Sequence, residues 1–129
     1  MFNENDPWDF STELEVRDYE LDSQGIVNNA TYLNYFEHCR HRFLRARGIN
    51  FIKLQAQGVD PVVAEVHIRY LQSLKSGDQF RVRLRWKAKG QVRYIFDQEI
   101  LRLPDLVPIA RGTFTVATLV NGKPGHFLL

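Results

Sequence analysis

The sequence predicts an α+β domain in which one antiparallel sheet of five strands wraps around a single long helix. Two changes of hydrophobic period predict this class. Apolar residues recur every three or four positions over residues 29–47, as on one face of a helix, and every second position after residue 61, as in strands. The chain has 129 residues, 44% of them hydrophobic and 25% charged, which suits one domain spanning residues 1–129.

The N-terminal segment is expected to supply an arm, a strand and a turn. Residues 1–10 have the composition of a loosely ordered arm, and residues 11–17 (STELEVR) alternate weakly between polar and apolar. Residues 22–25 (DSQG) are typical of a tight turn, with Asp at its first position and Gly at its fourth. The chain should therefore reverse just before the long helix.

The long helix is predicted over residues 29–47. Either Asn28 or Asn29 can cap its start, and Gly48 supplies its end. Residues 49–57 can form a shorter helix. The remaining period-two stretches predict the other four strands, and packing the sheet around the helix would bury the apolar face of each. These strands cover residues 62–71, 79–89, 91–102 and 107–120.

The charge of the chain is divided unevenly. Residues 1–22 hold eight acids and one base, a net charge of −7, and the rest holds 16 bases and seven acids, a net charge of +9. Many of the bases alternate with apolar residues along one predicted strand, which is typical of a solvated sheet face and does not favour a nucleic-acid site. These bases are Arg81, Arg83, Arg85, Lys87 and Lys89.

No metal, cofactor or disulfide is predicted. The one cysteine, Cys39, lies on the apolar helix face and is expected to be an inert buried thiol. His38 and His41 lie three residues apart without an evident third metal ligand. The sequence offers neither a secretion signal nor the run of about 18 apolar residues that a membrane span needs. We therefore expect a cytoplasmic protein.

The turn before the helix carries polar groups that could perform chemistry. A helix N-terminus leaves backbone N–H groups unpaired, and these can hold a carbonyl oxygen that gains negative charge. A carboxylate just upstream, such as Asp22, could attack that carbonyl or deprotonate a water. On spacing alone a plain turn and helix cap is the better interpretation, because such turns and caps are common, and the catalytic interpretation stays open beside it.

Residues 16–37 (VRDYELDSQGIVNNATYLNYFE) resemble a signature of the hotdog-fold thioesterases, in their 4-hydroxybenzoyl-CoA thioesterase-like branch. That signature is D-x-x-G-x-V-N-N-x-x-Y, running into the central helix. Residues 69–78 (RYLQSLKSGD) resemble the family's strand-turn segment, and the likeness extends over residues 12–121. The residues of these two stretches are most similar to those of the single-hotdog acyl-acyl carrier protein thioesterases of plastids and cyanobacteria.

The resemblance implies a hotdog fold, a homodimer that often pairs into a homotetramer, and acyl chains that enter between subunits. It places the catalytic acid on Asp22 and the oxyanion-binding backbone N–H on Asn29, with Asn28 and Tyr32 lining or bracing the pocket. Two positions depart from many relatives. Ile26 stands where they have His, which puts more of the chemistry on Asp22, and Ser73 stands where they have Pro.

The activity that the resemblance implies is hydrolysis of a fatty acyl-CoA or acyl-acyl carrier protein thioester to a free acid and a thiol. Asp22 would act as nucleophile or general base. The alternatives are an aromatic acyl-CoA thioesterase and a non-catalytic acyl-thioester sensor; a hotdog dehydratase would need a histidine that the segment between Asp22 and Asn29 lacks. Basic residues that could meet CoA phosphates or an acidic carrier protein are Lys75, Arg81, Arg83, Lys87, Lys89 and the helix arginines.

Overall fold

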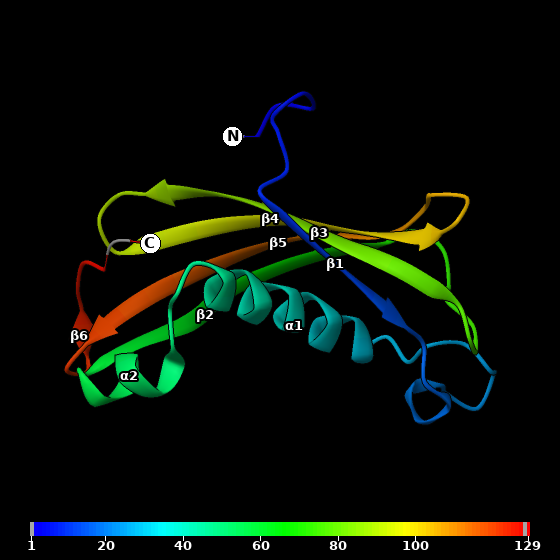
Figure 1. Cartoon of the computed structure of the whole chain (residues 1–129), viewed down its shortest axis with the longest axis horizontal. Helices are drawn as coiled ribbons and strands as arrows, with labels where there is room; N and C mark the ends of the chain where they lie inside the picture. The colour runs from blue at the N-terminus through cyan, green and yellow to red at the C-terminus, as the bar shows by residue number, and fades with distance from the viewer. Residues whose placement is uncertain (1, 128) are drawn as a thin grey trace.

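A bent antiparallel sheet arches over one long helix in the computed structural model, which describes residues 2–127 and 129 (Figure 1). The strand order is β1-β3-β4-β5-β2. The predicted α+β architecture is confirmed, with one addition: a two-residue strand, β6, pairs with the end of β5. The strands are β1 (Phe10–Glu15), β2 (Val59–Tyr70), β3 (Gln79–Lys89), β4 (Arg93–Leu103), β5 (Val107–Val120) and β6 (Lys123–Pro124).

Helix α1 (Thr31–Ala46) begins two residues later than the sequence predicts. The side chain of Asn28 accepts a hydrogen bond from Ala30 N (2.9 Å) and so shapes the turn before the helix, while the N-cap position itself has no side-chain bond. Gly48, with φ of +80°, ends the helix as expected. A short helix, α2 (Phe51–Ala56), follows and is capped by the side chain of Asn50.

The core lies between the apolar face of α1 and the concave face of the sheet. Aromatic rings pack directly across this boundary, as between Phe36 and Phe114 (centroids 5.0 Å apart) and between Tyr35 and Phe80 (4.6 Å). Cys39 belongs to the same cluster and is 0% exposed. This packing fixes the N-terminal end of α1 against the sheet.

Residues 2–9 lie on the convex face of the sheet, on the side opposite α1 (Figure 1). Asp9 N donates to Leu84 O (2.8 Å), and Arg85 Nη1 donates to the carbonyls of Asn3 (2.8 Å) and Asp6 (2.9 Å). Residues 2–9 thus differ from the loosely ordered arm expected at residues 1–10. A backbone bond to Leu84 and side-chain bonds from Arg85 hold this segment against β3, and the sequence pattern does not reveal them.

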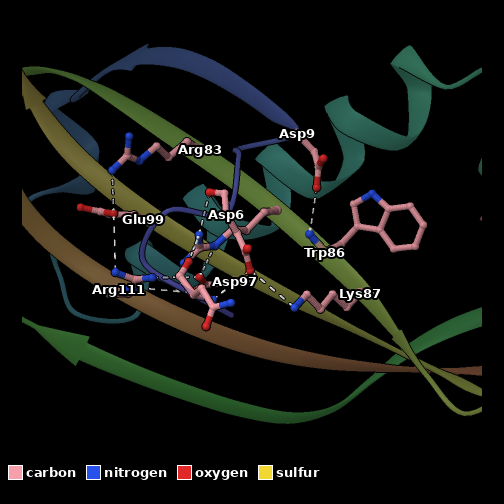
Figure 2. A network of polar contacts seen from close by, with 10 residues as sticks. Asp6, Asp9, Arg83, Trp86, Lys87, Asp97, Glu99 and Arg111 are labelled. Atoms are coloured by element: carbon pink, nitrogen blue, oxygen red, sulfur yellow. Dashed lines mark hydrogen bonds and ion pairs between the residues drawn. The ribbon is translucent and has the colours of Figure 1, made fainter. Parts of the chain in front are cut away.

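Of the bases of β3, Arg85 departs from the solvated face that their alternation predicts, whereas Lys87 and Lys89 are exposed. Arg85 is buried and its Nε lies 2.7 Å from Asp97, a carboxylate that Arg111 also contacts at 2.9 Å (Figure 2). Arg83 pairs with Glu99 at 3.0 Å. The register of β3 and β4 sets Arg83 opposite Glu99 and Arg85 opposite Asp97, and the N-terminal segment then covers these pairs.

Strand β2 is an edge of the sheet, and within the described residues nothing pairs with its outer side. Several large apolar side chains near this edge are 43–50% exposed. An exposed apolar edge strand is a surface that proteins ordinarily cover. These residues are Val62, Val63, Val66, Tyr70 and Leu71.

Candidate active site

The turn at residues 22–25 presents one oxygen of the Asp22 carboxylate. Its Oδ1 accepts hydrogen bonds from Gln24 N (2.8 Å) and Ile26 N (3.4 Å), and Gly25 N donates to Asp22 O (3.1 Å). Gly25 adopts φ of +78°, which a residue with a side chain rarely takes up. Oδ2 makes no hydrogen bond to any residue that the structure describes, so it is available to a substrate or a water.

Backbone bonds on both sides anchor this turn. Val27 N donates to Leu74 O (2.9 Å), and Ile26 bridges to Lys75, which ties the turn to the segment between β2 and β3. On the other side, Asn28 N donates to Glu20 O (3.0 Å). The carboxylate of Asp22 therefore sits on a rigidly held loop directly before α1.

An open cavity of about 300 Å³ lies beside the turn. Asp22, Asn29 and Tyr32 all line it, so the structure brings together three of the four residues that the sequence predicts for a site. Asn28 is not among its lining residues; its side chain instead accepts the hydrogen bond from Ala30 N that shapes the turn before α1. The other lining residues are Ile26, Val27, Tyr70, Leu71, Gln72 and Ser73.

The N–H of Asn29 donates no hydrogen bond to any part of the chain that the structure describes. Its carbonyl accepts a bond from the Tyr70 hydroxyl (3.0 Å), which fixes the peptide at the cavity wall. An unpaired N–H at the start of a helix can stabilise an oxyanion. Asp22 and Asn29, which carry a carboxylate oxygen and a backbone N–H without a hydrogen-bond partner among the described residues, therefore line the same cavity.

Two tyrosines complete the wall. The Tyr32 hydroxyl accepts a hydrogen bond from Leu74 N (3.1 Å), and burial raises its pKa, so the phenol stays neutral at pH 7. Tyr70 packs edge-on against it with ring centroids 5.5 Å apart. Sequence reasoning did not single out Tyr70 for the site. The sequence did hold one indication of its role. Tyr70 lies at the start of residues 69–78, the segment that resembles the family's strand-turn segment, and the bridge between Ile26 and Lys75 places this segment beside the turn.

Other predicted groups lie away from this cavity. His41 pairs with Glu37 (3.4 Å) in the second half of α1, and burial lowers the pKa of both His38 and His41. In the part of the chain that the structure describes, no three His, Cys, Asp or Glu side chains are grouped to hold a metal, and no helix is long and apolar enough to cross a membrane.

Most of the basic residues proposed to meet phosphates are engaged elsewhere. Arg81 pairs with Glu13 (3.0 Å), Arg83 with Glu99, and Lys87 with Asp6 (3.5 Å). Lys75 instead bridges to Ile26 at the cavity wall.

Comparisons with known proteins identify the family. Residues 16–124 match the family model described as the thioesterase-like superfamily. The chain is 44% identical over 109 residues to the chloroplastic acyl-acyl carrier protein thioesterase ATL3 of Arabidopsis thaliana, a match covering 84% of this chain and 57% of that protein. It is 29% identical to a putative esterase of Aquifex aeolicus, over 88% of each chain.

Solved structures show the same fold. A hypothetical protein from Aquifex aeolicus superposes with a TM-score of 0.86 at 27% identity, covering 92% of this chain and 93% of its own. A 1,4-dihydroxy-2-naphthoyl-CoA thioesterase from Synechocystis superposes with a TM-score of 0.88 at 16% identity, covering 92% and 89%. The chain spans 57–58% of the length of the two Arabidopsis relatives it matches.

Proposed function

The chain belongs to the thioesterase-like superfamily, and from that premise we propose that it hydrolyses a fatty acyl thioester to a free acid and a thiol. One observation carries the proposal: Asp22 and Asn29 line the same cavity, and among the described residues neither Oδ2 of Asp22 nor the N–H of Asn29 has a hydrogen-bond partner. A thioester carbonyl needs both groups at once, one to supply a nucleophile and one to hold the oxyanion.

In the proposed reaction, Asp22 either attacks the thioester carbonyl, giving a mixed anhydride that water opens, or removes a proton from the water that attacks. The Asn29 N–H stabilises the negative oxygen of the tetrahedral intermediate. Collapse of that intermediate breaks the carbon–sulfur bond and releases the thiolate. The thiolate then takes the proton that the water gave up, so the products are one acid and one thiol.

The substrate proposed is an acyl-CoA or an acyl-acyl carrier protein. Both carriers occur in the names of relatives, the carrier protein in the two Arabidopsis thioesterases and CoA in a Haemophilus influenzae protein 28% identical to this chain. Both present the thioester on a pantetheine arm with phosphate. Lys75, whose backbone bridges to the lining residue Ile26, is the basic residue we propose to meet that phosphate.

We also propose that the working form is a homodimer joined through the free edge of β2, with a tetramer of two such dimers as the larger assembly. The exposed apolar row on that edge supports this arrangement. Tyr70 and Leu71 belong to both the row and the Asp22 cavity, so a second copy docked there would border the site.

The test is a thiol-release assay across acyl-CoA and acyl-carrier substrates of graded chain length, with an aromatic acyl-CoA included. Asp22→Asn should lower turnover at least about 100-fold, because it removes the charge needed by a nucleophile or base. Asparagine keeps the Oδ1 acceptor that orders the turn, so the fold should survive. Asp18→Asn, a carboxylate outside the cavity, is the matched control and should retain activity.

Near-native turnover by a folded Asp22→Asn variant would overturn the assignment. Binding of acyl-CoA by the wild-type protein without any release of thiol would instead favour a sensor.

A further inference from the structure

A second cavity, of about 170 Å³, lies at the far end of α1 from Asp22. It opens between α1, α2 and the ends of β2, β4 and β5, and it shares no lining residue with the Asp22 cavity. Its wall is mostly apolar. The apolar side chains that line it include Leu44, Phe51, Leu54, Val63, Phe96 and Val116.

One buried cation, Arg40, lies in this apolar wall. Its side chain projects from α1, and the residue is only 7% exposed. Nη1 donates to Gln98 Oε1 (3.0 Å), and the guanidinium carbon lies 4.4 Å from the centre of the Phe114 ring. Both partners are uncharged, and no carboxylate among the described residues forms an ion pair with Arg40.

The lack of a carboxylate partner distinguishes Arg40 from Arg85, the other buried arginine described above. Arg85 is buried to a similar degree, but it has the Asp97 carboxylate at 2.7 Å. A buried charge without an opposite charge is costly, and proteins rarely keep one. Burial lowers the pKa of Arg40 to about 10, so the group is still a cation at pH 7.

The other titratable groups at the cavity do not balance this charge. Glu37 lies at the rim with its side chain 55% exposed, and it pairs with His41 at 3.4 Å. The negative charge of Glu37 raises the pKa of Arg40, but the two side chains form no ion pair. Among the described residues only Gln98 accepts a hydrogen bond from this guanidinium, and Arg40 lines a cavity whose other lining residues are mostly apolar.

We propose that this cavity binds a free fatty acid of medium chain length, with the carboxylate on Arg40 and the hydrocarbon chain along the apolar wall. An anion with an apolar tail matches both properties of the site. A plain alkyl chain would leave the cation unbalanced, and an inorganic anion would leave the apolar wall exposed to water. If the proposed thioester hydrolysis is correct, such an acid is its product, but binding itself needs no turnover.

Isothermal titration calorimetry of the full chain with octanoate, octanol and acetate tests the proposal. Octanol keeps the tail without the charge, and acetate keeps the charge without the tail. We expect octanoate to bind at least tenfold more tightly than either. Equal binding of octanoate and octanol by the wild-type protein would overturn the proposal without any variant.

Arg40→Met should lower octanoate affinity at least tenfold and leave octanol affinity unchanged or higher. Arg42→Met, an exposed arginine on the same helix, is the matched control and should bind octanoate as the wild type does. Gln98→Glu tests the same contact while keeping Arg40. It places a permanent carboxylate about 3.0 Å from Nη1, which should displace the ligand and lower octanoate affinity at least tenfold.

An Arg40→Met variant that folds and binds octanoate like the wild type would refute the site. The failure of the two proposals can be told apart with Asp22→Asn. That variant should lose thioester hydrolysis and bind octanoate as the wild type does. Tighter octanoate binding by Asp22→Asn would instead place the acid in the Asp22 cavity, because asparagine removes a carboxylate that repels it.

Discussion

A single hydroxyl at Tyr35 links α1 to the segment that precedes Asp22. Tyr35 is 3% exposed and donates a hydrogen bond to Glu20 Oε1 (2.8 Å). The same oxygen accepts from Arg17 N, and the Glu20 carbonyl accepts from Asn28 N. Burial and the neighbouring carboxylate raise the pKa of Tyr35 far above its usual range, so the hydroxyl remains a donor. Glu20 thus orders both sides of the Asp22 turn.

Tyr35→Phe should lower the free energy of unfolding by about 1–3 kcal/mol, because it leaves a mostly buried carboxylate of Glu20 with one donor fewer. Urea denaturation followed by circular dichroism measures this loss. Tyr19→Phe, at a tyrosine that is 79% exposed, should cost nothing measurable. Equal unfolding free energies for Tyr35→Phe and the wild type would show that the bond is unimportant.

Cys39 should make the protein less stable in alkali. Burial raises the pKa of its thiol to about 12, above its ordinary value of 9.0. Between pH 8 and 10 the unfolded thiol therefore loses its proton while the folded one keeps it, so the free energy of unfolding falls as pH rises. Over this interval the wild type should lose about 1 kcal/mol more than Cys39→Ala. Denaturant titrations at both pH values measure the difference, and parallel pH profiles would contradict it.

Site residues could be predicted from the sequence where the chemistry is local. Asp22 and Asn29 belong to one turn and helix start, so a motif of eight residues contains both. Tyr70 could not be found in this way, because its bond to Asn29 joins residues 41 positions apart. The buried state of Arg40 was equally hidden, since the helical pattern placed it on the polar face beside Arg42.

At the level of the secondary-structure elements, the sequence predicts the bounds of strand β3 but not the surroundings of its side chains. Its bounds and those of β5 agree with the sequence prediction to the residue, because alternation is a property of each strand alone. The burial and ion pairing of its arginines, in contrast, depend on β4 and on the N-terminal segment. Trp8, from that segment, lies over the guanidinium groups of Arg83 (4.3 Å) and Arg85 (4.5 Å). No pattern within residues 79–89 could reveal that cover.

Trp8→Ala should lower the free energy of unfolding by about 1–2 kcal/mol, since it removes cation–π contacts with Arg83, Arg85 and Arg111. Guanidinium denaturation measures the loss. Asn5→Ala changes an exposed residue of the same segment and should leave stability unaltered. If Trp8→Ala is as stable as Asn5→Ala, the segment contributes little to holding the sheet.

At the scale of the whole molecule, the two edges of the sheet differ. Edge strand β1 is six residues long and places Glu13 opposite Arg81, whereas β2 runs for twelve residues with an exposed apolar row. A long apolar edge favours pairing with a second copy, and a short charged edge does not. The family resemblance implies a homodimer without saying where its interface lies, and the strand order is what shows that β2 is an edge of the sheet.

Val62→Lys combined with Val66→Lys should convert the proposed dimer to a monomer, because both side chains are 43–44% exposed on the β2 edge and would carry like charges across the interface. Sedimentation velocity measures the change. Leu106→Lys, an equally exposed apolar residue in the β4–β5 turn, should leave the assembly intact. A dimer that persists in the double variant would place the interface elsewhere.

The positions of the chain ends matter for anyone who attaches the protein to a support. Arg47 holds the carbonyl of Leu129, Tyr94 accepts a hydrogen bond from its N–H (3.0 Å), and Leu129 lines the Arg40 cavity. The N-terminal segment instead leaves from the convex side (Figure 1). A purification tag or surface linker fused before residue 2 should therefore leave both cavities undisturbed, whereas one fused after Leu129 should perturb the Arg40 cavity.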